Sequence, residues 1–119
     1  MSENVLETIA SKAHEYFSIQ NRAREKALPL CREMIQNSSK AIRSSHRGQR
    51  DDARRLLDAN AALNDELLDA VQDSEEIRQA GFVHDAQKEY AEACITVAVI
   101  HEERIPGADE LRVAVPAYL

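Results

Sequence analysis

The sequence predicts an all-α fold, an antiparallel bundle of long helices. Gly and Pro number only three each in 119 residues and aromatic residues make up 4%, which argues against the turn-rich strands of a β-sandwich or barrel. The 18 Ala residues favour helix, because Ala loses the least free energy on entering one. Apolar side chains also recur in steps of three, four and seven, the period of one helix face. A chain of this length fits one domain, residues 1–119.

The first helix is predicted over residues 3–46. Pro29 lies inside its apolar pattern, and a proline there removes one backbone hydrogen bond and crowds the preceding turn. We therefore expect a kink or break between Lys26 and Pro29, and Gly48 is the natural stop. The apolar or small residues that mark one stripe of this helix are Val5, Ile9, Ala13, Tyr16, Phe17, Ala23, Ala27, Leu30, Met34, Ala41 and Ile42.

Two further helices and an apolar tail follow. The second helix is predicted over residues 49–79, with Asp51 and Asp52 favourable at its N-terminal dipole. The third is predicted over residues 82–104, and Pro106-Gly107 ends it. Residues 105–119 are apolar at their end, so this tail either docks on the bundle or begins a further element. The inward positions of the second helix are Ala53, Leu56, Leu57, Asn60, Leu63, Leu67, Val71 and Ile77.

Basic residues are concentrated in one segment. The formal net charge is −6, but residues 22–55 hold ten of the fifteen Lys and Arg residues and four acids, so this segment carries +6 and the rest carries −12. A local basic field attracts a polyanion over a Debye length of about 8–10 Å, whatever the distant charge. The alternative is an ordinary solvated helix face. The candidate nucleic-acid-binding residues are Arg22, Lys26, Arg32, Lys40, Arg43, Arg47 and Arg50.

Acidic residues form a stripe on the third predicted helix. Asp85, Glu89, Glu92, Thr96 and Glu103 fall within one arc beside the apolar face, and Glu89 lies nearest the apolar edge. Carboxylates three or four residues apart on a helix repel each other unless a cation lies between them. Such a stripe is a candidate site for Mg²⁺ or Mn²⁺, which prefer oxygen ligands and would position a phosphate and activate a water. A solvated acidic stripe is the alternative.

The remaining chemistry-bearing residues indicate an intracellular protein without a classical catalytic motif. Cys31 and Cys94 lie in apolar helical patterns, which is typical of buried reduced thiols. None of the four His residues pairs with a Cys at zinc-ligand spacing. The N-terminus has no leader-like pattern, and the longest apolar run, residues 93–100, is too short to span a bilayer. We therefore expect a cytoplasmic protein with no membrane partner.

Two stretches together resemble the translin/TRAX family of all-helical, oligomeric proteins that bind single-stranded nucleic acid. The match covers about residues 20–119. One stretch, residues 24–48, resembles the family's first long helix and its His-Arg ending. The other resembles the Glu-Tyr-x-Glu-Ala segment of the TRAX branch. The matching residues are Arg24-Glu25-Lys26-Ala27-Leu28, Cys31-Arg32-Glu33-Met34-Ile35, Ser39-Lys40-Ala41-Ile42-Arg43-Ser44-Ser45-His46-Arg47-Gly48, and Lys88-Glu89-Tyr90-Ala91-Glu92-Ala93, with Glu102 and Arg104 farther along.

The resemblance implies a translin-like fold and two possible functions. In the first, the protein binds single-stranded RNA or DNA, and its complete form is an endoribonuclease in which Glu89 and Glu92 are catalytic and bind Mg²⁺ or Mn²⁺. In the second, it is a non-catalytic nucleic-acid-binding or assembly module. Family members continue past a stretch like Pro116-Ala117-Tyr118-Leu119 into helices with further acids, so we expect a truncated bundle with an incomplete site. The resemblance and the apolar tail both predict a homo-oligomer.

Overall fold

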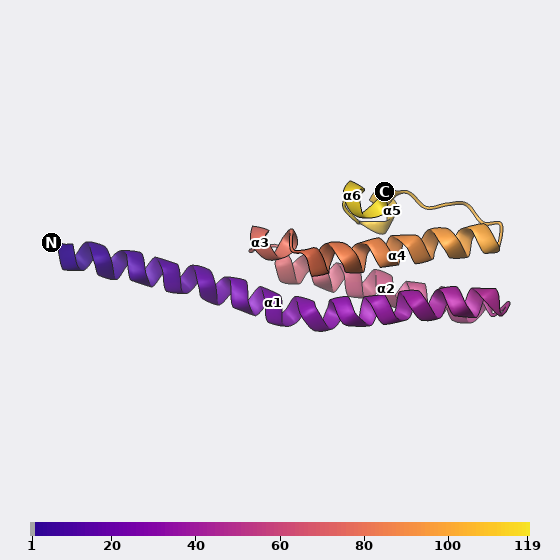
Figure 1. Ribbon diagram of the computed structural model, residues 1–119, viewed down its shortest axis with the longest axis horizontal. Coiled ribbons are helices and arrows are strands. Elements are labelled where there is room, and N and C mark those ends of the chain that lie inside the picture. Colours follow the sequence, from indigo (N-terminus) through magenta and orange to yellow (C-terminus); the bar gives the residue numbers. More distant parts are fainter. Residues whose placement is uncertain (1) are drawn as a thin grey trace.

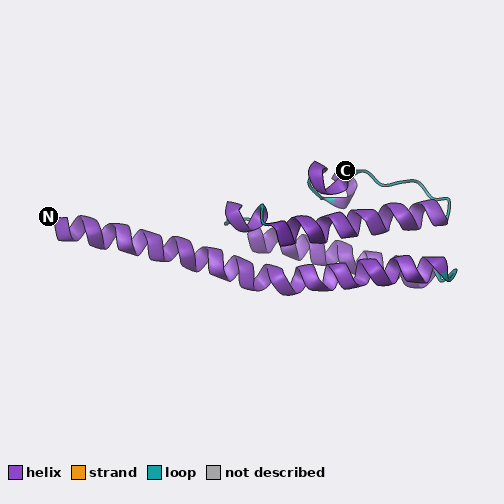
Figure 2. Ribbon diagram, viewed as in Figure 1, coloured by secondary structure: helices purple, strands orange, loops and turns teal. Residues whose placement is uncertain are grey.

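The computed structural model describes residues 2–119, with side chains from Asn4 onward, and confirms the all-α bundle of long helices. No strand occurs in this part of the chain (Figure 2). The elements, labelled in Figure 1, are α1 (Ser2–His46), α2 (Arg50–Val71), α3 (Glu75–Arg78), α4 (Gly81–Ile100), α5 (Ala108–Leu111) and α6 (Val115–Tyr118).

The bundle consists of α1, α2 and α4. Both α2 and α4 pack mainly on the C-terminal part of α1, and α6 packs on α4 (Figure 1). The centre of α1 supplies Ala27 and Met34, both with no exposed surface, and α2 supplies the equally buried Leu67 and Val71. Small residues such as Ala86 and Ala93 on α4 let the helices approach closely.

The turn between α1 and α2 follows the sequence prediction. Gly48 has a φ of +75°, which an L side chain rarely adopts. The amide of Gly48 donates to the carbonyl of Ser45 at 3.0 Å, and the amide of Gln49 donates to that of Ser44 at 2.8 Å. This is the Schellman pattern, which satisfies the last carbonyls of α1 and reverses the chain. The helix itself continues through Pro29, so the predicted break does not occur, although its N-terminal half slopes relative to its C-terminal half (Figure 1).

The N-terminal end of α1 projects beyond the bundle as an arm, which we define as residues 2–20. Here the apolar stripe is not buried, because Val5, Ile9, Ala13, Tyr16 and Phe17 are exposed and the first buried residue of α1 is Ala23. The projection makes the molecule 70 Å long and 22 Å by 17 Å across. Its radius of gyration is 18.3 Å. A compact chain of this size would have a radius of about 13–14 Å.

Helix lengths explain the exposed arm. The 45 residues of α1 span about 68 Å, whereas the 22 residues of α2 span only about 33 Å. The second helix was predicted to reach residue 79, but it ends at Val71. Ser74 then caps a separate short helix, α3, and its hydroxyl accepts from the amide of Ile77 at 3.4 Å. The shortened α2 leaves the start of α1 without a covering helix.

The third helix ends at Ile100 rather than at Arg104, and the tail docks on the bundle. Glu102 takes a φ of +56° and closes α4 with the same hydrogen-bond pattern that Gly48 gives α1. Within the tail, Val113 and Ala117 are buried. No helix of residues 2–119 is long and apolar enough to cross a membrane.

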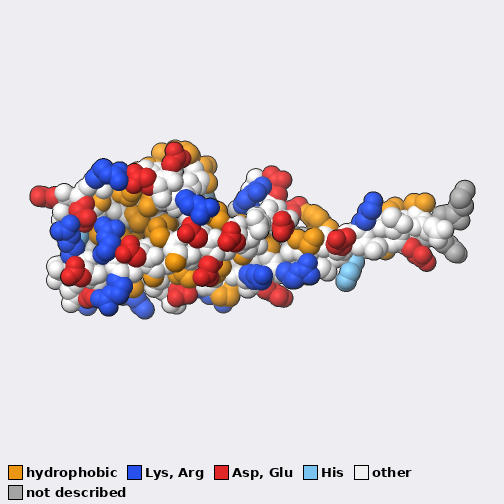
Figure 3. Space-filling model, turned by 180° about the vertical axis from the view of Figure 1, so that it is seen from behind, with side chains coloured by type: hydrophobic (Ala, Val, Ile, Leu, Met, Phe, Trp, Pro, Cys, Tyr) orange, Lys and Arg blue, Asp and Glu red, His pale blue; other side chains and the backbone are white. Residues whose placement is uncertain are grey.

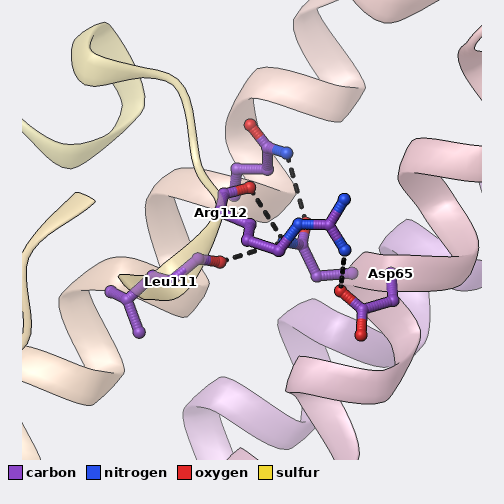
Figure 4. Close-up of polar contacts among 5 residues, drawn as sticks. Asp65, Leu111 and Arg112 are labelled. Atoms are coloured by element: carbon purple, nitrogen blue, oxygen red, sulfur yellow. Dashed lines mark hydrogen bonds and ion pairs between the residues drawn. The ribbon is translucent and has the colours of Figure 1, made fainter. Parts of the chain in front are cut away.

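Buried amides hold the tail to α2 and α4 (Figure 4). The Asn64 side chain donates to the carbonyls of Leu111 and Arg112 at 3.1 and 3.0 Å, and it accepts from the Gln87 amide at 3.2 Å. Gln87 in turn accepts from the amide of Ala114 at 3.4 Å. The Arg112 guanidinium pairs with Asp65 at 2.6 Å (Figure 4). The tail is therefore fixed by hydrogen bonds to residues far away in the sequence.

Candidate nucleic-acid interface

A groove of about 670 Å³ runs between the C-terminal half of α1 and the N-terminal half of α2. Three predicted binding residues, Lys40, Arg43 and Arg47, line it from α1. Their spacing of three and four residues puts them on one face over two turns, about 10 Å of helix. Arg55 lines the groove from α2. The turn at Gly48 positions the two walls, because it folds α2 back along α1.

The groove carries a positive charge. Its acidic lining residues are Glu33 and Asp52, against four cations. Asp52 is already paired with Arg55 across one turn of α2. In contrast, Lys40, Arg43 and Arg47 form no ion pair with any residue from Asn4 to Leu119, and all three are exposed. Their charges are therefore available to an anion, and Arg can hold a phosphate through two parallel hydrogen bonds.

The other predicted basic residues lie outside this groove. Lys26 lines a separate hollow beside Leu30, together with the acids Glu66 and Asp69 of α2. Arg50 pairs with Glu103 at 3.2 Å, so its charge is partly neutralised. Arg22 and Arg32 are exposed on α1 and line none of the cavities described. The seven predicted binding residues are thus divided among separate parts of the surface, and three of them line the groove.

Sequence reasoning missed the groove wall that α2 contributes. Arg55 was counted in the basic segment but not among the candidate binding residues, because these were chosen for lying opposite the apolar stripe of the first helix. The neutral residues Asn37 and Ser44 also line the groove and add hydrogen-bonding groups. The signal available was the short connection at Gly48, which makes the two helices antiparallel neighbours and brings residues on either side of it together.

The two predicted catalytic acids, Glu89 and Glu92, which we call the acidic pair, lie outside the basic groove. Glu89 is partly buried and Glu92 is exposed, one turn apart on α4, and neither lines the basic groove. Glu92 borders a hollow of about 210 Å³ beneath the C-terminal residues, along with Lys88 and Tyr118. Neither carboxylate forms an ion pair or hydrogen bond with the residues from Asn4 onward.

The acidic pair can supply some of the oxygen ligands that Mg²⁺ requires. Among the side chains from Asn4 to Leu119, no group of three or more His, Cys, Asp or Glu is close enough together to hold a metal ion. Mg²⁺ usually binds one or two carboxylates and takes its remaining ligands from water and substrate phosphates. Glu89 and Glu92 therefore fit the carboxylate share of such a site, provided that a phosphate is present.

The two cysteines are not candidates for chemistry. Both are free thiols in the core, and burial raises the pKa of Cys31 and that of Cys94 to about 11. Cys94 lines a cavity of about 390 Å³ between α2, α4 and the tail, beside Tyr90, whose pKa burial also raises. A thiol that stays protonated at neutral pH is a poor nucleophile.

Comparison of the chain with protein-family models, curated proteins and solved structures found no match. The assignment of function therefore rests on the geometry and charge of the groove and on the sequence resemblance described above.

Proposed function

We propose that this chain binds single-stranded RNA or DNA through the groove between α1 and α2. The observation that carries the proposal is the set of three unpaired cations, Lys40, Arg43 and Arg47, along one wall of an open groove. The resemblance to the translin/TRAX family supports a single-stranded ligand. No aromatic side chain lines the groove, so the contacts go to phosphates rather than to stacked bases.

The groove residues take different roles in this binding. Arg43 and Arg47 each bind a phosphate through the guanidinium fork, whereas Lys40 acts as a point charge. Arg55 holds Asp52 and so limits its repulsion of the strand. Asn37 and Ser44 donate hydrogen bonds to phosphate or sugar oxygens. Binding of this kind does not depend on base sequence and weakens with salt.

Fluorescence anisotropy with a labelled oligo-dT and an oligo-U tests the proposal. We expect Arg43→Ala/Arg47→Ala to weaken binding by about tenfold or more at low salt, because it removes two charge-assisted phosphate contacts. The control Arg78→Ala/Arg112→Ala changes the net charge equally but lies outside the groove, and it should keep most of the affinity. Equal loss of affinity in both double variants would mean that binding depends on the net charge of the chain and not on the groove.

A catalytic role is the second candidate. We propose that Glu89 and Glu92 hold Mg²⁺ or Mn²⁺ and serve as catalytic residues of a metal-dependent endoribonuclease. Their position one turn apart on α4, without an ion-pair partner among the described residues, favours this role. When bound, the metal would orient a phosphate and lower the pKa of a water. The chain's own contribution is to point both carboxylates to the same side of the helix.

Cleavage of single-stranded RNA with and without Mg²⁺ tests the catalytic role. We expect cleavage only with the metal, and its loss in Glu89→Ala and in Glu92→Ala. The neighbouring Asp85→Ala is the control, because Asp85 lies on the same side of α4 but matches no residue of the family pattern. No cleavage by the chain, or equal cleavage by the two glutamate variants, leaves the alternative: a non-catalytic nucleic-acid-binding or assembly module.

We further propose that the chain acts in the cytoplasm as a homo-oligomer. The two free, buried thiols support a reducing compartment. The exposed apolar residues of the arm support self-association, since a projecting helix with an apolar face is a surface for association.

A further inference from the structure

The arm carries an apolar stripe that nothing in the bundle covers. Its five large apolar side chains have exposed fractions between 47% for Tyr16 and 64% for Leu6. The same stripe is buried farther along α1, where Ala23 and Ala27 face the bundle. Figure 3 shows apolar side chains along the thin projecting part of the molecule. The arm is thus a continuation of the core face of α1 without its partner helices.

The spacing of the apolar positions in the stripe is the same in both directions along the helix. Its six apolar positions are symmetric about residue 11, so that 5 corresponds to 17, 6 to 16 and 9 to 13. Residue 11 is also the midpoint of the arm, which spans residues 2–20. A two-fold axis through this point would therefore place each apolar position level with another. The six residues of the stripe are Val5, Leu6, Ile9, Ala13, Tyr16 and Phe17.

Polar residues occupy the opposite side of the arm. At 100° per residue, the six apolar positions fall within an arc of about 120°, and Ser11 points directly away from its centre. Glu7, His14 and Glu15 also lie outside this arc, and all are exposed. An arc of this width is what one helix needs to pack against a single partner helix.

A partner helix would stabilise the arm. Isolated helices of fewer than about 12–15 residues are marginal in water, and packing of an apolar face supplies most helical stability in proteins. The arm is only slightly longer than this limit, and it contains Ser, Thr, Asn and aromatic residues, which are weaker helix formers than Ala. From Asn4 onward, the one side-chain hydrogen bond between the arm and the rest of the bundle joins Tyr16 to Glu76 of α3.

We propose that the arm binds the arm of a second copy of this chain, antiparallel and centred on residue 11. Leu6 of each copy then lies level with Tyr16 of the other, and Ile9 with Ala13. A self-complementary patch is what a two-fold symmetric dimer requires. The tip of each arm reaches residue 20 of its partner, so the overlap uses the whole arm and ends where the bundle begins. This proposal specifies the surface for the self-association proposed above and rests on it, but it does not depend on nucleic-acid binding.

The size of this surface predicts a dimer that dissociates on dilution. Each of the five large apolar side chains exposes roughly 100 Å², so the two arms would bury at most about 1,000 Å² of apolar surface. Stable interfaces start at about 1,000–1,200 Å² in total. Because the contact is apolar, it should persist at about 1 M salt, where contacts between exposed charges are screened.

Sedimentation velocity over a range of protein concentrations tests the proposal. We expect the 13.4 kDa chain to change from monomer to dimer as its concentration rises, in low and in high salt. Ile9→Glu puts a charge at the centre of the stripe and should shift the midpoint at least tenfold higher in concentration. The matched control Ser11→Glu adds the same charge on the opposite side and should leave the midpoint unchanged. A monomer at every concentration would overturn the proposal. Dimerisation that Ile9→Glu leaves unchanged would also overturn it, because the copies would then associate through another surface.

Disulfide trapping tests the antiparallel order. A mixture of Leu6→Cys and Tyr16→Cys chains should form a mixed disulfide, because these positions lie level in the dimer. Leu6→Cys alone should not cross-link, since the two copies of position 6 are ten residues apart along the dimer, about 15 Å. The opposite outcome, cross-linking of Leu6→Cys with itself but not with Tyr16→Cys, means parallel pairing and refutes the proposed order. Oligo-dT binding by Ile9→Glu, measured separately, shows whether the groove functions when the dimer is lost.

Discussion

The tail's attachment to the bundle predicts that one buried amide has a large effect on stability. Asn64 is 1% exposed, donates to two tail carbonyls and accepts from Gln87. In Asn64→Ala the Gln87 amide, which is 5% exposed, loses its acceptor. A buried donor left unpaired costs about 1–3 kcal/mol, and loss of two hydrogen bonds to partly hydrated carbonyls adds about 1 kcal/mol. We therefore expect Asn64→Ala to lower the free energy of unfolding by about 2–4 kcal/mol.

The neighbouring residue provides the control. Asp65 also holds the tail, through Arg112, but both side chains are more than half exposed. Exposed ion pairs contribute about 0–1 kcal/mol, so Asp65→Ala should cost less than about 1 kcal/mol. Urea unfolding followed by circular dichroism measures both values, and limited proteolysis should cut the tail of Asn64→Ala faster. An effect of Asn64→Ala below about 0.5 kcal/mol, or one equalled by Asp65→Ala, would refute the role assigned to the buried amides.

Four further predictions concern stability and thiol reactivity. Glu102→Gly should raise the free energy of unfolding by about 0.5–1 kcal/mol in urea titrations, because Gly adopts the φ of +56° without strain. Met34→Ala, at a fully buried position, should lower it by about 2–5 kcal/mol, whereas Ile35→Ala, at a position 39% exposed, should lower it much less. With pKa values of about 11 against a reference of 9.0, Cys31 and Cys94 should react with a thiol reagent at pH 8 about 100-fold more slowly in the folded chain than after denaturation. The same raised pKa values mean that the unfolded chain loses these protons first, so stability should fall as pH rises from about 9 toward 11.

The sequence predicted the long helices well, because their evidence is local. The apolar period and the few Gly and Pro residues indicated α1, α2 and α4, and Gly48 marked the turn correctly. The predicted end of the second helix was wrong because Ile77 continues the apolar period of Val71, which concealed the cap at Ser74. Periodicity reports which face is apolar, but it does not report whether another helix reaches far enough to cover that face.

The parts that could not be predicted depend on contacts between distant residues. Asn64 and the tail carbonyls that it binds are 47 and 48 residues apart, and no local pattern pairs them. The groove likewise needs α2 beside α1 before Arg55 can join Arg43 and Arg47. All four groove cations do lie within the basic segment that the charge pattern marked, residues 22–55.

The salt dependence of oligonucleotide binding tests the groove most directly. For single strands, the logarithm of the binding constant falls with the logarithm of salt concentration with a slope of about −0.7 per phosphate contact. Three groove cations predict a slope of about −2, or about a 20-fold loss of affinity between 50 and 200 mM salt. Arg43→Ala/Arg47→Ala should reduce the slope to about −0.7, a loss of about threefold over the same range. A slope that is the same in both proteins, or a wild-type affinity that does not change with salt, would contradict the account.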